Sequence, residues 1–431
     1  MHSTPAPFLF AGRYTGISVT ARSKLSPPTC RIRLPAALIA MAMLSIALVS
    51  GNAFAQAENA NEILSKTGNQ MSSAAMPIPA APGLAAKSYM LIDYNTGKVI
   101  AEHNSSERLE PASLTKMMTA YLVSSEMKFR NLKPEDMVPV STKAHKTIGS
   151  RSFLEPGSLV SVRDLMYGLV VQSGNDASVA LAEHVGGTEE GFVSMMNQMA
   201  QRLGMKDTHF ANSTGLPSPD HYTTARDMAV LSRAVIRDHP NHYKLYSVEE
   251  FTFNGITQKN RNTLLLRDPT VDGIKTGHTN AAGYCLVASA VRGDMRLISV
   301  LLGARNEQLR STESLRALNY GFRFFETIKL ASANQKLGDA KVWGGTLDNV
   351  AMAARDDKFV TLPTGQSAAI SREMHLSRDL IAPISEGQEL GMLKVKLEDK
   401  LIAELPIVAI QPVEQAGFFS RTTDKFKRIL D

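Results

Sequence analysis

Residues 271–304 read VDGIKTGHTNAAGYCLVASAVRGDMRLISVLLGA, and this stretch decides the fold prediction. Two apolar runs, 283–291 and 295–304, flank a turn that contains Gly293. Such runs on either side of a glycine turn predict two adjacent antiparallel strands. The tripeptide Lys-Thr-Gly at 275–277 lies just ahead of them, behind another glycine turn. We therefore expect this tripeptide at the edge of the same sheet, where it can face a cleft.

Strand and helix signals alternate upstream of this stretch. Two alternating runs flank a hairpin signal at 95–98, Asn-Thr-Gly-Lys. Apolar positions then recur at helical spacing from 111 to about 127, and a capping box of Ser161 and Asp164 opens a later helix. Strands, helices and strands again predict one α/β domain over residues 87–330, with an antiparallel sheet that draws on both ends of the segment.

The composition changes at both ends of this domain. Residues 56–86 are polar and then rich in alanine and proline, which predicts a flexible lead-in. Residues 331–412 carry the pattern of short strands with turns, so we expect a separate small all-β domain there. More than one domain is in keeping with a chain of 431 residues of which 44% are hydrophobic.

Residues 1–55 have the anatomy of a secretory signal peptide. Five lysines and arginines, with no acidic residue, precede an apolar run over 34–49 and the small-residue pattern Ala53-Phe54-Ala55. The run is short for a bilayer span and the pattern follows it closely, so cleavage after Ala55 is the favoured interpretation. An uncleaved membrane anchor is the alternative. The sequence thus predicts an exported protein.

Charge and cysteine content exclude several classes of partner and cofactor. Of the net charge of +6, the signal segment carries +5, and the near-neutral remainder gives no support to a nucleic-acid partner. Cys30 would leave with the signal, so Cys285 alone would remain and no internal disulfide can form. Cys285 lies in an apolar run, where we expect a small buried hydrophobe. The sequence has no His-Glu-x-x-His motif, and we expect no metal and no other cofactor.

The C-terminal segment, residues 413–431, ends in GFFSRTTDKFKRILD. On a helical projection its aromatic and aliphatic side chains share one third of the circumference, and its lysines and arginines occupy the remainder. An aromatic-rich arc beside a basic face is typical of a helix that lies on an anionic membrane surface. Docking of this helix on its own protein is the alternative interpretation.

Lys-Thr-Gly also occurs at 66–68, so its context must decide which copy carries chemistry. That copy lies in the polar lead-in with no strand pattern after it, whereas the copy at 275–277 precedes apolar runs. Two more elements support the second copy: Ser-x-x-Lys at 113–116 opens a helix, and Ser-x-Asn at 173–175 lies between two helices. Another Ser-x-Asn, at 332–334, falls outside this order, and we interpret it as chance.

The three elements suit the activation of a serine. Positions i and i+3 share a helix face, so Ser113 and Lys116 can be neighbours. A serine hydroxyl is a weak nucleophile until a base takes its proton, and a lysine can be that base where burial and a second cation, here Lys275, favour its neutral form. Ser173 could pass a proton to a leaving amine, and Asn175 could hold an amide of the substrate. Each motif alone is weak, but the three in this order form a strong signal.

These motifs resemble those of the serine penicillin-binding proteins and β-lactamases. Longer stretches are similar to the low-molecular-mass D-alanyl-D-alanine carboxypeptidases, among them PASLTKMMTAYLV, VVQSGNDASVALAEHV, STGLPSPDHYTTARDMA and GFRFFET. The resemblance extends from about residue 85 to the C-terminus. It implies a β-lactamase-like, transpeptidase-like α/β catalytic domain followed by the small β domain and the amphipathic helix. It also implies that the protein removes the terminal D-alanine from peptidoglycan pentapeptide stems and is acylated by β-lactams.

The resemblance implies roles for individual residues. Ser113 would be the acylated nucleophile and Lys116 its general base. Ser173, Asn175 and Lys275 would complete the proton network and hold the substrate.

The edge of the predicted sheet would supply the remaining contacts of the substrate. The backbone N–H groups of Ser113 and His278 would form the oxyanion hole. Thr276 and Arg310 would hold the terminal carboxylate, since a charge-assisted pair suits the free carboxylate that a carboxypeptidase must recognise. Gly277 completes the substrate-binding motif.

Alternatives on the same fold stay open at this point. A class A β-lactamase depends on a glutamate between the second and third motifs, and residues 191–248 contain none, which disfavours rapid β-lactam hydrolysis. A D,D-endopeptidase or transpeptidase remains possible because the acyl-enzyme can pass to other acceptors. A non-catalytic wall-binding protein is disfavoured by the intact pair of Ser113 and Lys116. The resemblance places the protein in the periplasm, peripherally attached to the outer face of the inner membrane.

Overall fold

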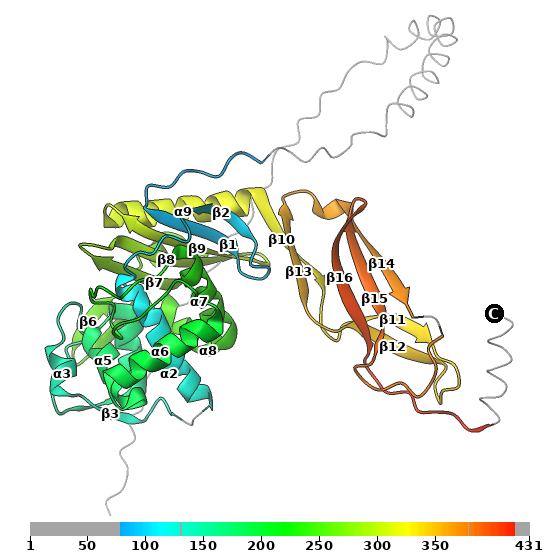
Figure 1. Cartoon of the computed structure of the whole chain (residues 1–431), viewed down its shortest axis with the longest axis horizontal. Helices are drawn as coiled ribbons and strands as arrows, with labels where there is room; N and C mark the ends of the chain where they lie inside the picture. Colours follow the sequence, from blue (N-terminus) through cyan, green and yellow to red (C-terminus); the bar gives the residue numbers. More distant parts are fainter. Residues whose placement is uncertain (1–77, 130–131, 378, 419–431) are drawn as a thin grey trace, which may run out of the picture. The chain divides into compact units, whose positions relative to one another are not determined.

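The computed structural model describes residues 78–129, 132–377 and 379–418 (Figure 1). The predicted signal peptide, the Lys-Thr-Gly copy at 66–68 and most of the predicted terminal helix lie outside these residues. None of the helices in the described part of the chain is both long enough and apolar enough to span a bilayer.

Five antiparallel strands form the sheet that carries the candidate site. Their order across the sheet is β2–β1–β9–β8–β7. The bounds are Val99–His103 for β2, Ser88–Asp93 for β1, Met295–Ala304 for β9, Gly283–Arg292 for β8 and Val271–Thr279 for β7. The predicted hairpin, the two adjacent antiparallel strands and a sheet drawn from both ends of the segment are all confirmed.

Helices cover both faces of this sheet because its strands are apolar on both sides. The helix α9 (Glu307–Phe324) packs on one face together with Leu286 and Ala288, and α7 (Ala225–Asp238) packs on the other together with Val287 (Figure 1). Successive residues of β8 therefore point into different halves of the core. Cys285 is fully buried, as predicted, and burial raises the pKa of its thiol to about 11.

The remaining helices cluster on the α7 side of the sheet. The longer ones are α2 (Lys116–Phe129), α5 (Asn175–Gly186) and α6 (Glu189–Leu203), and the shorter ones are α3 (Thr142–Lys146), α4 (Val162–Tyr167) and α8 (Pro240–Tyr243). Four short turns of 3₁₀- or π-helix join them, namely η1 (Ala112–Thr115), η2 (Gly168–Gln172), η3 (Lys244–Ser247) and η4 (Thr263–Leu266). Two small two-stranded antiparallel sheets complete this part. In one, β3 (Met137–Pro139) pairs with β4 (Leu159–Ser161) across the segment that contains α3, and in the other, β5 (Glu250–Phe253) and β6 (Ile256–Lys259) form a hairpin.

The N-cap predicted at Ser161 is present at the start of α4, and the Asp164 carboxylate bonds to the Ser161 hydroxyl, where a full capping box would use the Ser161 backbone N–H. The backbone N–H of Asp164 donates to Ser161 Oγ at 3.0 Å, and the Ser161 hydroxyl donates to the Asp164 carboxylate at 2.8 Å. These bonds satisfy an N–H group that has no partner within the helix. The helix predicted from residue 111 begins as η1 and continues as α2, so Ser113 lies in a tight turn at the helix start.

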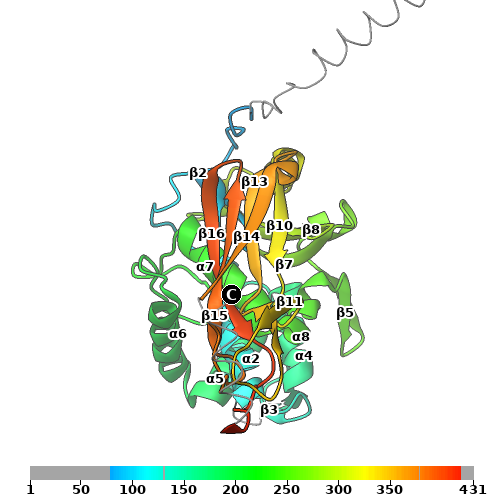
Figure 2. The ribbon, with the colours of Figure 1, turned by 90° about the vertical axis from the view of Figure 1, so that its right-hand side faces the viewer.

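The C-terminal part of the described chain is all-β. A five-stranded antiparallel sheet has the order β11–β12–β16–β15–β14. Figure 2 shows its strands β14, β15 and β16. Its strands are β11 (Lys336–Lys341), β12 (Asn349–Ala354), β14 (Ile370–Leu376), β15 (Glu389–Leu397) and β16 (Lys400–Ala409), and a short 3₁₀ turn, η5 (Ser367–Ala369), precedes β14. Alternating residues such as Leu393 and Val395 enter a compact apolar core.

Two features of this part differ from the boundaries drawn on the sequence. The strand β10 (Phe325–Ala331) pairs with β13 (Lys358–Pro363), so a strand assigned mainly to the catalytic segment joins the β-rich segment. At the other end, residues 413–416 bond to the all-β part, and Val413 is 1% exposed in its core. Pairing between distant strands, which local composition does not encode, produces both differences.

Candidate active site

Ser113 lies in the tight turn η1, and a close backbone approach holds this turn in place. Ala112, the first residue of η1, has φ of +48°, a left-handed conformation that L-residues rarely adopt. Gly215 packs against this turn so closely that a Cβ on it would lie 1.8 Å from the Ala112 carbonyl oxygen. Only glycine fits at position 215, and this contact fixes the position from which Ser113 presents its hydroxyl.

Lys116 is buried one turn after Ser113, with 1% of its surface exposed. Its Nζ lies 3.1 Å from Ser113 Oγ, 2.6 Å from Asn175 Oδ1 and 2.6 Å from the carbonyl oxygen of Thr214. Two carbonyl-type oxygens can accept the two N–H bonds of a neutral amine, which leaves its lone pair for the Ser113 hydroxyl. The surroundings of Lys116 therefore suit an amine that can accept a proton from serine.

The electrostatics of the site agree with this arrangement. Burial lowers the pKa of Lys116 to about 7, the Asp176 carboxylate opposes this shift, and Arg261 adds to it. A large part of the amine is therefore neutral at neutral pH. An unshifted lysine pKa of 10.5 would leave almost none of the amine neutral, and so almost none available as a base, at this pH.

Ser173 and Asn175 lie at the break between η2 and α5, as predicted. Ser173 has φ of +67°, is 2% exposed, and its Oγ has no hydrogen-bond partner among the described residues. A buried hydroxyl left without a partner beside a cavity can bond to a ligand there. Asn175 is held at both ends of its amide, because Nδ2 donates to the carbonyl oxygen of Ile148 at 2.5 Å while Oδ1 accepts from Lys116. A substrate amide would have to share or displace one of these bonds.

The strand β7 brings the Lys-Thr-Gly motif at 275–277 against the Ser113 turn. A Cβ on Gly277 would lie 3.0 Å from the Pro111 carbonyl oxygen and 3.3 Å from the Leu114 nitrogen, so a larger residue would crowd the Ser113 turn. Lys275 is 3% exposed, and its Nζ donates to the Thr276 carbonyl oxygen at 3.1 Å. Burial holds the pKa of Lys275 well below its ordinary value, and the nearby cations, Lys116 first, lower it further.

Six of the nine predicted site residues line one cavity of about 430 Å³. These six are Ser113, Ser173, Thr276, Gly277, His278 and Arg310. The other three, Lys116, Asn175 and Lys275, are buried. The tertiary structure thus unites three motifs that are about 60 to 100 residues apart in the sequence.

Arg310 reaches the cavity from α9 and is 5% exposed. Its Nη2 donates to Glu307 Oε1 at 2.7 Å and to the Arg261 carbonyl oxygen at 3.3 Å. Burial lowers the pKa of Arg310 from its ordinary value, and Glu307 opposes this shift. Arginine remains protonated at neutral pH, so Arg310 brings a positive charge to the cavity that Thr276 also lines.

Six polar residues of this lining were not predicted from the sequence, namely Ser150, Asn260, Arg261, Thr263, Tyr284 and Glu307. Arg261 follows an asparagine about ten residues before the Lys-Thr-Gly strand, and a cation so close to the motif was a usable signal. Glu307 lies one helical turn before Arg310, at a spacing that allows an ion pair. No local signal marks Ser150, because its place in the cavity depends on how the loop after α3 folds back.

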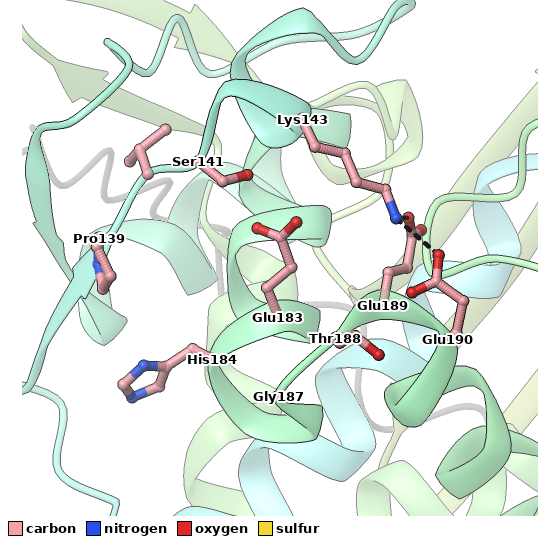
Figure 3. A pocket seen from close by; sticks show the side chains of 10 residues that line it. Pro139, Ser141, Lys143, Glu183, His184, Gly187, Thr188, Glu189 and Glu190 are labelled. Atoms are coloured by element: carbon pink, nitrogen blue, oxygen red, sulfur yellow. Dashed lines mark hydrogen bonds and ion pairs between the residues drawn. The ribbon is translucent and has the colours of Figure 1, made fainter.

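A second hollow, of about 550 Å³, lies near α3, α5 and α6 and shares no lining residue with the first (Figure 3). Three of its charged side chains form ion pairs with one another, since Lys143 Nζ lies 2.9 Å from the Glu189 carboxylate and 3.0 Å from the Glu190 carboxylate. The described residues contain no group of three or more metal-ligating side chains.

Comparison with known proteins identifies the family. The model of the D-alanyl-D-alanine carboxypeptidase family matches residues 75–306, and that of the penicillin-binding protein 5 C-terminal domain matches residues 325–415. The chain belongs to the D-alanyl-D-alanine carboxypeptidase family. The resemblance found in the motifs is thereby confirmed, as is a transpeptidase-like domain followed by an all-β domain. The protein is a D-alanyl-D-alanine carboxypeptidase of the penicillin-binding class, which makes it a serine hydrolase.

Individual relatives match over nearly their whole length. The D-alanyl-D-alanine carboxypeptidase DacA of Escherichia coli strain K12 is 41% identical over 395 residues, which cover 90% of this chain and 96% of the relative. The crystal structure of penicillin-binding protein 5 from Haemophilus influenzae superposes with a TM-score of 0.70 at 41% identity, covering 78% of this chain and 99% of that one. Penicillin-binding protein D2 from Listeria monocytogenes in its cefotaxime-bound form has a TM-score of 0.53 at 29% identity, covering 56% and 99%.

Proposed function

We propose that this carboxypeptidase acts on peptidoglycan pentapeptide stems through an acyl-enzyme on Ser113. The observation that carries the proposal is the placement of Lys116 Nζ, 3.1 Å from Ser113 Oγ and bonded to two carbonyl-type oxygens at 2.6 Å. A neutral amine in this position can take the serine proton as the oxygen attacks the carbonyl carbon of the penultimate D-alanine.

The first half-reaction then breaks the terminal peptide bond. The backbone N–H groups of Ser113 and His278 stabilise the negative charge that develops on the carbonyl oxygen. As the tetrahedral intermediate collapses, the C–N bond breaks and the proton held by Lys116 passes through Ser173 to the leaving amine. The Ser173 hydroxyl lies at the cavity wall and has no hydrogen-bond partner in the part of the chain that the structure describes, which supports this role. D-Alanine leaves, and its acyl partner stays on Ser113 as an ester.

The second half-reaction restores the enzyme. Lys116, neutral again, takes a proton from a water molecule that attacks the ester, and the proton returns to Ser113 Oγ as the C–O bond breaks. Arg261 keeps positive charge near Lys116 and so favours its neutral form, a role that the sequence had suggested for Lys275, whose own pKa burial lowers; Lys275 belongs to the proton network. Thr276 and Arg310 hold the terminal carboxylate of the substrate, Gly277 lets this edge lie beside Ser113, and Asn175 positions Lys116.

Mass spectrometry tests this proposal directly. The purified protein is incubated with a diacyl-D-Ala-D-Ala peptide and, separately, with penicillin. We expect release of one D-alanine from the substrate peptide. With penicillin, we expect an adduct on the proteolytic fragment of the protein that contains Ser113. The Ser113→Ala variant serves as the control, and an equal adduct on that variant would exclude Ser113 as the nucleophile. Transfer of the acyl group to an added amino acid would instead reveal transpeptidation.

We also propose that the protein is exported to the periplasm and held on the outer face of the inner membrane by its C-terminal segment. The signal-like pattern over 1–55 and the aromatic and basic pattern near the C-terminus support this location. Residues 413–416 bond to the all-β part, so the truncation that tests the anchor belongs after Gly417 and not at the segment boundary drawn from the sequence, after Pro412. The truncated protein should move to the soluble fraction, and continued membrane association would refute the anchor.

A further inference from the structure

Glu307 is the one acidic side chain among the described residues that line the Ser113 cavity. It is the first residue of α9, three positions before Arg310. Its Oε1 lies 2.7 Å from Arg310 Nη2, and the two side chains are 57% and 6% exposed respectively. An exposed carboxylate thus pairs with a buried guanidinium inside the proposed substrate site.

The pairing has a clear electrostatic reason in the empty enzyme. A buried guanidinium without an acceptor is costly, and Glu307 gives Arg310 an acceptor that the carbonyl of Arg261 alone does not replace. A substrate carboxylate that binds Arg310 meets the same group from the cavity side. It must displace Glu307 or lie beside a like charge, and both weaken binding.

We propose that Glu307 is a specificity-determining residue, an internal carboxylate that occupies Arg310 in the free enzyme and competes with the terminal carboxylate of the substrate. Glu307 therefore lowers the affinity for ligands that carry this carboxylate, and it does so more than for neutral ligands. Its exposure keeps the exchange reversible, since the side chain can swing into solvent. The inference rests on the proposed contact between Arg310 and the substrate carboxylate.

A matched pair of thioesters isolates this effect. Both carry the same diacyl-D-alanyl group. One has thioglycolate as its leaving group and so bears a carboxylate, and the other has thioglycolamide, which is neutral. The readout is the ratio of kcat/KM for the charged substrate to that for the neutral one. In Glu307→Gln this ratio should rise about two- to fivefold, the size expected for a partly exposed charge pair, and mainly through KM of the charged substrate.

Two further variants make the result decisive. Glu135→Gln removes an exposed carboxylate that pairs with Arg163 on the surface, and it should keep the wild-type ratio. Adding Arg310→Gln to Glu307→Gln should abolish the gain, because the competition acts through Arg310.

The outcomes separate this inference from the proposed function. An unchanged or lower ratio in Glu307→Gln overturns this inference, since Glu307 would then have no effect on specificity or would help to orient Arg310. A gain that persists without Arg310 also overturns it. Turnover of the neutral thioester reports that each variant is folded. If the wild-type protein turns over neither thioester and forms no adduct on Ser113, the proposed function itself has failed.

Discussion

The pH dependence of acylation provides the sharpest test of the proposed role of Lys116. Only the neutral amine can take the serine proton, and burial lowers its pKa to about 7. About one tenth of the amine is neutral at pH 6 and about nine tenths at pH 8, so the second-order acylation rate should rise about tenfold between them and then level off. A lysine with the ordinary value of 10.5 would give about a hundredfold rise over the same interval and no plateau below pH 10.

Stopped-flow acylation by a fluorescent penicillin, measured from pH 5.5 to 9.5, resolves these cases. Arg261 lowers the pKa of Lys116, so Arg261→Gln should move the rising limb to higher pH. Arg163→Gln removes an exposed arginine on the surface and provides the matched control, which should leave the limb in place. A rate that is independent of pH between 6 and 8, or one that still climbs above pH 9, would refute the reasoning.

Four further measurements test the structure. Gly277→Ala should slow acylation at least tenfold and lower the free energy of unfolding by about 1–3 kcal/mol, because the added Cβ would press on the Ser113 turn. Gly338→Ala is the control and should have neither effect, because a Cβ at this position meets only a side chain at 3.7 Å. Ser173→Ala should lower kcat by about 10²- to 10⁴-fold with little change in melting temperature, since its hydroxyl has no partner among the described residues. Leu393→Ala should lower the unfolding free energy by about 2–5 kcal/mol in chemical denaturation, because the side chain is 3% exposed in the all-β core. The truncation after Gly417 should retain activity on a short D-Ala-D-Ala peptide while it loses sedimentation with membranes.

Local pattern sufficed for much of the fold. The apolar runs and the glycine turn determine β8 and β9, and the cap at Ser161 determines the start of α4. The same local signals failed where strands pair across the chain. β10 continues directly from α9 without a marker of its partner, and its pairing with β13 appears only in the folded structure.

For the candidate site, the sequence by itself determined which residues carry the three motifs and in what order they occur. It also determined the geometry within a motif that is one helical turn long, because the helix sets the spacing of its own side chains. The motif at 113–116 needed no tertiary information to place an amine near a hydroxyl. The tertiary structure alone decided that Lys116 is buried and has a pKa of about 7, that the strand at Gly277 lies against the serine turn, and that Arg261 and Glu307 line the same cavity. Burial and contact between distant segments depend on how the whole core packs, and no short stretch of sequence contains that information.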